Sequence, residues 1–208
     1  MLFRSLWLNC STNTGRSGRG PTMLMSPMST LMNWGSSSND ERRRKRPSGV
    51  ARLSPRLAQM GTTLVTLLIT PDAVPTAHFA HVGDSRGYLF RDGRLTQSTT
   101  DHTLIETYIA RGVLTPAKAK THPERHVLTR AIGVSRTAKP DFTAYPLHPA
   151  DILLLCSDGL TKMLEDTDIA EIMGQAQGDP IRICDRLIDC SLARGGEDNV
   201  TVIVVSHP

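Results

Sequence analysis

Three aspartates stand at comparable places in the sequence, each at the junction between an apolar run and a stretch of small residues. Asp84 and Asp158 each come just after an apolar run, and Asp198 comes just before one. Such junctions can converge at one edge of a sheet, where neighbouring glycines let the backbone come close. Carboxylate oxygens are the ligands that Mg²⁺ and Mn²⁺ prefer. The three aspartates are therefore candidate ligands of a divalent metal ion.

Each aspartate also has a local explanation that needs no metal. Asp84 fits an Asx turn, Asp158 fits a helix N-cap, and Asp198 fits a turn carboxylate. Spacing along the chain does not show that the three side chains meet in space. Taken singly, the local explanations are the simpler ones, so both interpretations stay open at this point.

The apolar pattern predicts the strands that would position these carboxylates. Runs rich in β-branched and aliphatic residues are typical of strands, and Asp92-Gly93 is a strong signal for a hairpin turn. The predicted strands cover residues 61–69, 76–82, 87–91, 95–99, 152–156 and 200–205.

Helical spacing of apolar residues, with capping residues, predicts the helices between these strands. The predicted helical segments are residues 102–111, a short helix from Pro116, 160–164, 166–173, and a helix that opens at Asp179-Pro180 and ends at Gly195-Gly196. The apolar stripe of the last helix is predicted to consist of Ile181, Cys184, Leu187, Ile188 and Leu192. Antiparallel strands with separate helices indicate an α+β layered architecture.

Residues 1–59 differ in composition from the rest of the chain. They hold ten Lys/Arg and two Asp/Glu, whereas residues 60–208 hold 14 Lys/Arg and 18 Asp/Glu, so the net charge of +4 comes from the first segment. We interpret residues 1–52 as a basic tail without regular structure. The run 42–46 would also fit a nucleic-acid arm, but it has no interleaved aromatic residues, so we expect no nucleic-acid partner.

Six short motifs follow one another across residues 60–208. They are GTT at 61–63, VGDSR at 82–86, DH at 101–102, LTRAIG at 128–133, CSDGL at 156–160 and EDNVTVIVV at 197–205. Any one of them alone is a weak signal, but GDSR, SDGL and DNVTV together are specific. In this order they resemble the PPM family, the metal-dependent type 2C Ser/Thr protein phosphatases, and its bacterial branch in particular.

The resemblance implies an α+β fold in which two antiparallel sheets form a β-sandwich flanked by helices, in α-β-β-α layers. Residues 53–208 would be the C-terminal two-thirds of a PPM-type phosphatase domain, so the fold would be incomplete. Residues 1–52 do not match the family. They are interpreted either as a true tail or as the product of a misread gene start or reading frame.

The resemblance also implies roles for individual residues. Asp158 and Asp198 match two carboxylates that bind one metal, and Asp84 matches a ligand of a third, weaker metal. Residues implied to support these loops are Gly83, Ser85, Ser157, Gly159 and Asn199. Residues 104–125 match a flap beside the site that influences substrate choice. The implied reaction is hydrolysis of phosphoserine or phosphothreonine by water that Mg²⁺ or Mn²⁺ activates.

One part of the family pattern does not occur in residues 1–59. The family carries an Asp-Gly-x-Gly-Gly-His-like motif there, whose aspartate bridges two metals, and no Asp-Gly pair precedes Asp92. We therefore expect fewer than the family's two to three metal ions. The alternative to an active phosphatase is a catalytically impaired remnant, or a non-catalytic regulatory or binding module of the same fold.

The remaining expectations concern compartment and partners. The four cysteines form no CxxC pair, and Cys156 and Cys184 lie in apolar patterns, which favours free thiols in a reducing cytoplasm. No apolar run is long enough to predict a membrane span. The resemblance implies phosphoprotein substrates and a Ser/Thr protein kinase whose action the protein opposes.

Overall fold

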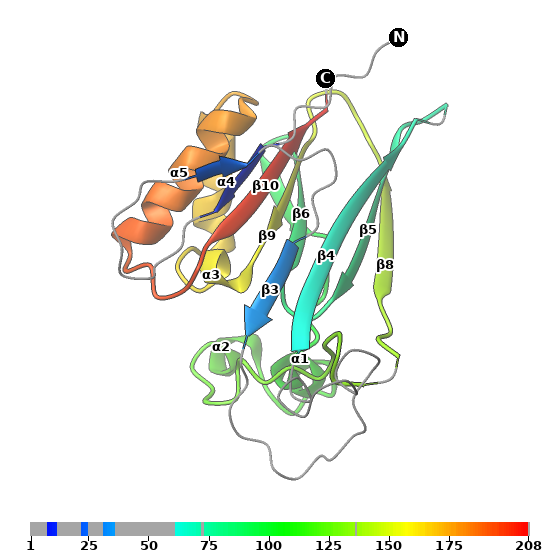
Figure 1. Cartoon of the computed structure of the whole chain (residues 1–208), viewed down its shortest axis with the longest axis vertical. Helices are drawn as coiled ribbons and strands as arrows, with labels where there is room; N and C mark the ends of the chain where they lie inside the picture. The colour runs from blue at the N-terminus through cyan, green and yellow to red at the C-terminus, as the bar shows by residue number, and fades with distance from the viewer. Residues whose placement is uncertain are drawn as a thin grey trace.

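The computed structural model describes residues 61–71, 73–135 and 137–207, together with the backbone of three short strands before residue 36. Two antiparallel sheets pack face to face, and helices lie against one of them (Figure 1). The predicted α+β sandwich is therefore confirmed. Within these ranges, no helix has the length and apolar character needed to cross a bilayer.

The larger sheet has six strands in the order β2-β1-β10-β9-β6-β7. Its strands are β1 (Leu8–Ser11), β2 (Thr22–Leu24), β6 (Arg86–Arg91), β7 (Arg94–Gln97), β9 (Ile152–Cys156) and β10 (Thr201–Ser206). The predicted β6–β7 hairpin is confirmed, since Asp92 and Gly93 both have positive φ, 50° and 77°, as its tight turn requires. The adjacent, antiparallel strands β9 and β10 pair from Cys156↔Val202 to Ile152↔Ser206. This pairing brings the end of β9 next to the start of β10.

The smaller sheet has four strands in the order β3-β4-β5-β8. Its strands are β3 (Leu31–Gly35), β4 (Gly61–Thr70), β5 (Thr76–Val82) and β8 (Asp141–Pro146). Strands β4 and β5 match the prediction, whereas β8 was not predicted. Strand β8 lies at the sheet edge with four of its six residues exposed and two half-buried, and Pro146 ends it, so it lacks a continuous apolar signal.

Strands β1, β2 and β3 fall within residues 1–52, which the sequence predicted as a tail without regular structure. Strand β1 pairs with β10, and β3 pairs with β4. The expectation of no regular structure is therefore wrong at these three strands. The other residues of the predicted tail, and the basic run 42–46, lie outside the described residues.

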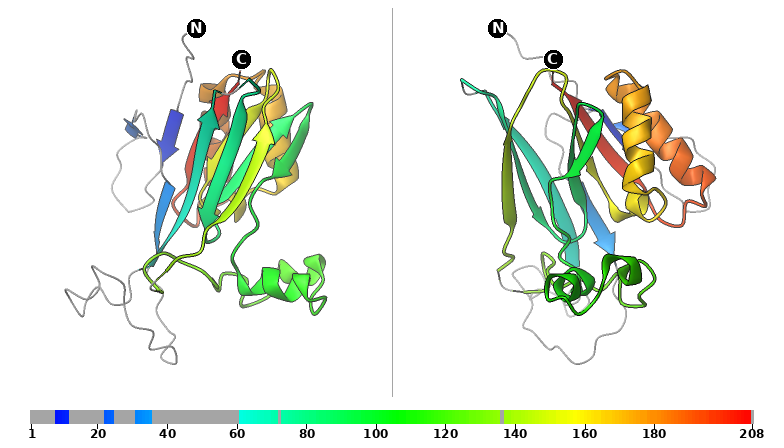
Figure 2. Two further views of the ribbon diagram at one scale, coloured as in Figure 1. Left: turned by 90° about the vertical axis from the view of Figure 1, so that its right-hand side faces the viewer. Right: turned by 180° about the vertical axis from the view of Figure 1, so that it is seen from behind.

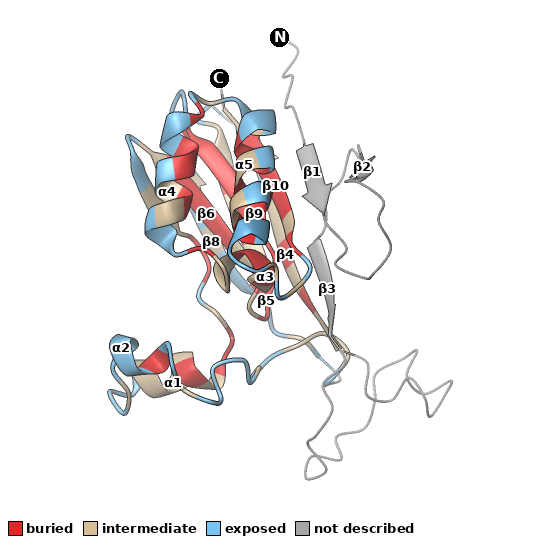
Figure 3. Ribbon diagram, turned by 90° about the vertical axis from the view of Figure 1, so that its left-hand side faces the viewer, coloured by how far each residue is buried: buried red, intermediate tan, exposed pale blue. Residues whose placement is uncertain are grey.

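Strand β9 is buried along its whole length because both faces of its sheet are covered. Its even-numbered residues, such as Leu154, point towards the helices, and Leu153 and Leu155 point towards the other sheet. Two cores result, one between the sheets and one between the larger sheet and the helices (Figure 3).

Helices α4 (Asp166–Gln175) and α5 (Pro180–Ala193) cover the outer face of the larger sheet (Figure 2). The short helices α1 (Leu104–Ala110) and α2 (Pro116–Ala119) form the expected flap at one end of the sandwich. Among the described residues no helix covers the outer face of the smaller sheet. The predicted four layers are therefore present in part, with three of them described.

The buried stripe of α5 differs from the predicted one at its two ends. Ile181 and Leu192 are 40% and 42% exposed, and Ile183 is fully buried. Cys184, Leu187 and Ile188 are buried as predicted. The facing set is thus Ile183, Cys184, Leu187, Ile188 and Ser191, because 3.6 residues per turn carry positions 181 and 192 round to the edges of this face.

Candidate metal centre

Asp158 lies at the end of strand β9, as the first residue of the helical turn α3 (Asp158–Thr161). The turn begins two residues earlier than predicted. Its backbone is closed by a hydrogen bond from the Lys162 N–H to the Asp158 carbonyl, 2.9 Å long. The Asp158 side chain is 16% exposed, so its carboxylate lies mostly away from solvent.

The loop that carries Asp198 is clamped against this turn. Ser157 and Thr201 exchange hydrogen bonds, since the Thr201 N–H donates to Ser157 Oγ at 3.0 Å and the Ser157 N–H donates to the Thr201 carbonyl at 3.0 Å. Ser157 Oγ also donates to the Asn199 carbonyl at 3.2 Å. A Cβ on Gly159 would lie 2.3 Å from that same carbonyl oxygen, so only glycine allows the approach. Three of the predicted supporting residues, Ser157, Gly159 and Asn199, therefore join the two loops.

Lys162 connects the two aspartates that this clamp brings together. Its Nζ lies 2.7 Å from Oδ2 of Asp158 and 2.7 Å from Oδ2 of Asp198. Burial disfavours its charge, but hydrogen bonds to the two carboxylates outweigh burial and raise the pKa of Lys162. Burial likewise opposes the charge on Asp198, yet the hydrogen bond from Lys162 lowers the pKa of Asp198. The two carboxylates thus share one positive charge.

Asp84 follows β5 in a turn that Gly83 makes possible. Gly83 has φ +109°, and a Cβ there would lie 2.2 Å from the Thr63 side chain. Thr63 and Ser85 hydroxyls hydrogen bond at 2.9 Å, which fixes the turn to β4. Gly83 and Ser85, the residues on either side of Asp84, therefore fix the backbone position of Asp84.

The acidic surroundings of Asp84 change its protonation. Burial, then the charges of Asp158 and Asp101, raise the pKa of Asp84 from 3.8 to about 7. The charge of Asp158 thus acts on Asp84 and favours its protonated form, as expected for neighbouring carboxylates. Asp198 joins them through Lys162, so the structure brings all three predicted aspartates to the same end of the sandwich.

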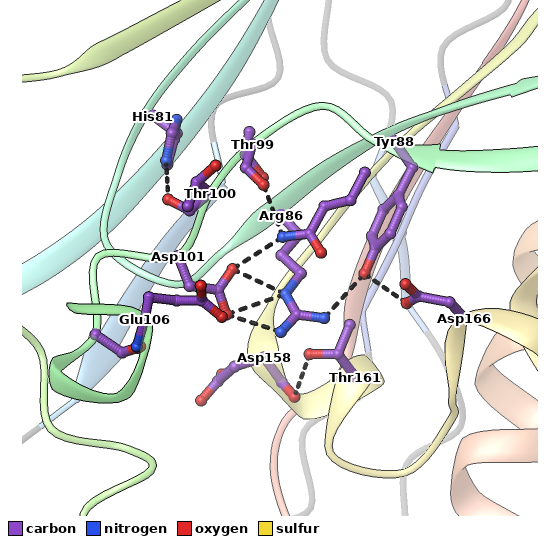
Figure 4. Close-up of polar contacts among 12 residues, drawn as sticks. His81, Arg86, Tyr88, Thr99, Thr100, Asp101, Glu106, Asp158, Thr161 and Asp166 are labelled. Carbon is purple, nitrogen blue, oxygen red and sulfur yellow. Dashed lines mark hydrogen bonds and ion pairs between the residues drawn. The ribbon is translucent and has the colours of Figure 1, made fainter. Parts of the chain in front are cut away.

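Arg86, the last residue of the GDSR motif, ties strand β6 to the segment before the flap. Its guanidinium donates through Nε and Nη2 to Asp101, at 2.8–3.1 Å, and through Nη1 to Tyr88 Oη at 3.1 Å. Tyr88 Oη in turn donates to Asp166 at 3.1 Å. Figure 4 shows this chain running past the α3 turn that carries Asp158. The Arg86 guanidinium is therefore hydrogen bonded within the protein, to Asp101 and Tyr88.

His102 fastens the base of the flap to the Gly83 turn. The Gly83 N–H donates to His102 Nδ1 at 3.1 Å, and the His102 N–H donates to the Gly83 carbonyl at 2.9 Å. On the other side of the ring, Nε2 lies 3.1 Å from Asp141 Oδ2, and Arg130 donates to Asp141 Oδ1 at 2.6 Å. Burial is the largest influence on this ring and lowers the pKa of His102. A neutral imidazole with Nδ1 as acceptor fits these contacts.

The donor set fits a divalent metal only in part. Two carboxylates already hold one cationic group between them, which shows that the place suits a positive charge. Carboxylate oxygens suit Mg²⁺ or Mn²⁺. In the described part of the chain, however, no three or more His, Cys, Asp or Glu side chains are grouped so that they could hold a metal. The described residues therefore fit one cation held by few ligands.

Cys156 does not offer a second chemistry at this site. Burial raises the pKa of its thiol to about 12, so the thiol stays protonated at neutral pH and is a poor nucleophile. A hollow of about 400 Å³, lined by residues such as Phe90, Ile152 and Met173, lies at the other end of β9. It is lined by none of the three aspartates, so it is separate from the carboxylate site.

Lys162 and Asp101 were not among the predicted site residues. Lys162 lies four residues after Asp158, and this spacing puts opposite charges on one side of a helical turn, so the sequence did contain a signal for the pair. The contact between Lys162 and Asp198 had no local signal, because 36 residues separate them.

Comparison with known proteins agrees with this fold. The sequence profile of the family described as stage II sporulation protein E (SpoIIE) matches residues 36–208. The chain is 40% identical over 152 residues to the Ser/Thr protein phosphatase PstP of Mycobacterium tuberculosis, covering 73% of this chain and 28% of PstP. It is 38% identical over 148 residues to the Ser/Thr phosphatase Stp of Listeria welshimeri, covering 71% of this chain and 57% of that protein.

A solved structure gives the same result in three dimensions. The catalytic domain of PstP, in complex with two manganese ions, superposes with a TM-score of 0.65 at 36% identity, covering 76% of this chain and 63% of that one. The chain thus belongs to the family of SpoIIE/PPM-type phosphatase domains. It spans less than two thirds of the length of each of these relatives.

Proposed function

We propose that this chain acts as a metal-dependent Ser/Thr protein phosphatase, which hydrolyses phosphoserine and phosphothreonine in proteins. The observation that carries the proposal is that Asp158 and Asp198 both contact the same cationic group, the Lys162 ammonium. Ser157 and Gly159 hold the two loops that carry these aspartates together. Family membership supplies the reaction class, and PstP is named a Ser/Thr protein phosphatase.

Asp158 and Asp198 would hold a Mn²⁺ or Mg²⁺ ion, and Asp84 would contribute to a further, weaker site. A divalent ion bound there would supply Lewis acidity, which makes water more acidic and offsets phosphate charge. The protein's own part is positioning. The short clamp between the two loops keeps the carboxylates oriented, and the Arg86–Asp101 pair keeps the neighbouring Asp84 turn rigid.

A second candidate is a non-catalytic regulatory or binding module of the same fold. Two observations favour it. No described group of three or more metal-binding side chains occurs, and the Lys162 ammonium already neutralises part of the charge on the carboxylate pair. Such a module would retain the fold and a single cation site without turnover.

The proposal extends to partners and compartment. The substrates would be phosphoproteins, and the activity would oppose a Ser/Thr protein kinase. Cys156 and Cys184 are buried and form no disulfide bond, which is compatible with a reducing cytoplasm, where we place the protein.

Hydrolysis of a phosphothreonine peptide, with Mn²⁺ and then with excess EDTA, tests this proposal. We expect phosphate release that EDTA abolishes and that Asp158→Asn lowers at least about 100-fold, because the variant loses one carboxylate charge at the ion. Lys139→Met, at an exposed lysine outside the flap, is the matched control and should leave the rate unchanged. Metal-independent release, or no release from a folded protein, would reject the phosphatase and favour the binding module.

A further inference from the structure

Lys162 takes no part in the chemistry proposed above, although its ammonium lies between the two candidate metal ligands. Nζ is 2.7 Å from Oδ2 of Asp158 and 2.7 Å from Oδ2 of Asp198. A divalent ion that used both of these oxygens would need the same space. One cation, either the ammonium or the metal ion, can occupy it at a time.

We infer that Lys162 is a tethered cation that holds the carboxylate pair together when no metal is bound. A divalent ion binds at Asp158 and Asp198 only by displacing the ammonium, so Lys162 weakens metal binding. This inference rests on the proposed metal site, and it adds the residue that controls how readily the site fills.

The backbone keeps Lys162 in this position. The Lys162 N–H donates to the Asp158 carbonyl at 2.9 Å, so the lysine follows Asp158 by one closed helical turn. Residues four apart on such a turn face the same side. Lys162 therefore reaches Asp158 without a change in the backbone, and its long stem extends to Asp198 in the neighbouring loop.

The Asp198 carboxylate is oriented so that one oxygen is presented to the lysine. Its Oδ1 accepts a hydrogen bond from the Asn199 N–H at 2.8 Å, which leaves Oδ2 for Nζ. Without a cation at this place, Asp158 and Asp198 would repel each other across the clamp. The lysine thus supplies the charge that keeps the two loops together in the metal-free protein.

Displacement needs a path for the ammonium, and the exposures provide one. The Lys162 side chain is 24% exposed and the Asp198 side chain 41% exposed, so this end of the site opens to solvent. A lysine has a flexible four-carbon stem that can turn outwards and leave its charge in water. A divalent ion offers twice the charge of the ammonium, so exchange is favourable once the metal concentration is high enough.

Calorimetric titration with Mn²⁺ alone measures this competition. Lys162→Met keeps a flexible apolar stem one atom shorter and removes the charge. We expect it to tighten Mn²⁺ binding roughly tenfold, since two charge-assisted hydrogen bonds at a partly exposed site no longer compete. Lys120→Met, which removes a charge from an exposed ion pair, is the matched control and should bind Mn²⁺ as the unmodified protein does. Circular dichroism confirms that each variant is folded.

The possible outcomes separate this inference from the proposed function. Equal or weaker binding by Lys162→Met, with binding lost in Asp158→Asn, would leave the metal site standing and overturn the role of Lys162. No binding by any folded variant, Lys162→Met included, would overturn the metal site and the inference together.

A second measurement needs no variant and holds even if Lys162→Met fails to fold. Acylation of lysine amines by acetic anhydride, read by peptide mass spectrometry, reports how accessible each ammonium is. We expect Mn²⁺ to increase labelling of Lys162 relative to Lys120, because the displaced amine enters solvent. Unchanged or decreased relative labelling at a Mn²⁺ concentration that saturates the calorimetric titration would overturn displacement.

Discussion

At the scale of single residues, the site is a crowded acidic patch that a few cations balance. Asp84, Asp158 and Asp198 provide the negative charge, Lys162 joins the last two, and burial and repulsion leave Asp84 with a raised pKa. Asp84 is the member whose ionisation costs the folded protein most. The pH dependence of stability without metal should therefore depend on this residue.

We predict that Asp84→Asn stabilises the metal-free protein at alkaline pH. The folded pKa, about 7, lies above the unfolded value of 3.8, so the folded state retains a proton that the unfolded state releases. The stability from this proton is fully present below about pH 4 and is lost as pH rises towards about 7. Urea unfolding in EDTA should show the variant more stable by up to about 4 kcal/mol at pH 8 and equal to the unmodified protein near pH 4. An identical pH slope for both proteins would contradict this assignment.

At the scale of elements, the site exists because two neighbouring strands end and begin side by side. Strand β9 delivers Asp158 into the α3 turn, and β10 receives the chain from the Asp198 loop. The close approach of the two depends on Gly159, whose absent Cβ makes room for the Asn199 carbonyl. Asp158 and Asp198 therefore come together because the α3 turn contacts the loop before β10.

We predict that Gly159→Ala destabilises the protein by about 3 kcal/mol, because a Cβ 2.3 Å from a backbone oxygen forces one of the two loops to move. Gly174→Ala is the matched control. Its Cβ would meet only Phe90 Cζ, at 3.6 Å, inside helix α4, so it should stabilise the protein by up to about 1 kcal/mol. Urea unfolding of both variants makes the comparison. A Gly159→Ala protein as stable as the unmodified one would show that the Asp158 and Asp198 loops can move apart at little cost.

At the scale of the whole molecule, the two sheets are unequally covered. Helices α4 and α5 protect the larger sheet, whereas the described outer face of the smaller sheet carries Leu68 and Phe142, 62% and 74% exposed. Phe142 also lies on β8, which is an edge strand. Exposed apolar side chains beside an open strand edge favour association between molecules.

We predict that Phe142→Lys reduces concentration-dependent self-association, because a charge on an edge strand opposes pairing with another edge. Sedimentation velocity over a concentration series measures this, and the free energy of unfolding should stay within about 0.5 kcal/mol, since the side chain is mostly exposed. Val113→Lys, at a flap residue that is 72% exposed, is the control and should not change association. Equal association of Phe142→Lys and the unmodified protein would exclude this face as the cause.

The sequence was sufficient for elements whose pattern is local. Strands β9 and β10 are nearly continuous apolar runs, β4 is rich in aliphatic and β-branched residues, and β5 alternates. The β6–β7 turn is marked by Asp92-Gly93. Strand β8 was missed because an edge strand alternates exposed and half-buried residues without an apolar run. The three short strands before residue 36 were missed because they have no sustained period of their own.

The three candidate aspartates could be named from the sequence, but the contacts between their loops could not. The motifs around Asp84, Asp158 and Asp198 could be found from residue order, but their meeting depends on which strands pair, and Cys156 and Val202 in the β9–β10 pair are 46 positions apart. Lys162 was overlooked because a lysine on a helical turn is most simply a solvated charge. Its second partner, Asp198, becomes adjacent only in the folded sheet.

Anomalous scattering from Mn²⁺ in a crystal soaked in MnCl₂ tests the central claim most directly. The claim is that Asp158 and Asp198 form a divalent metal site which the Lys162 ammonium otherwise fills. We predict a manganese peak about 2.1 Å from a carboxylate oxygen of each aspartate, with Lys162 turned towards solvent. No peak at this place, or a peak elsewhere with Lys162 still bound to both carboxylates, would contradict it.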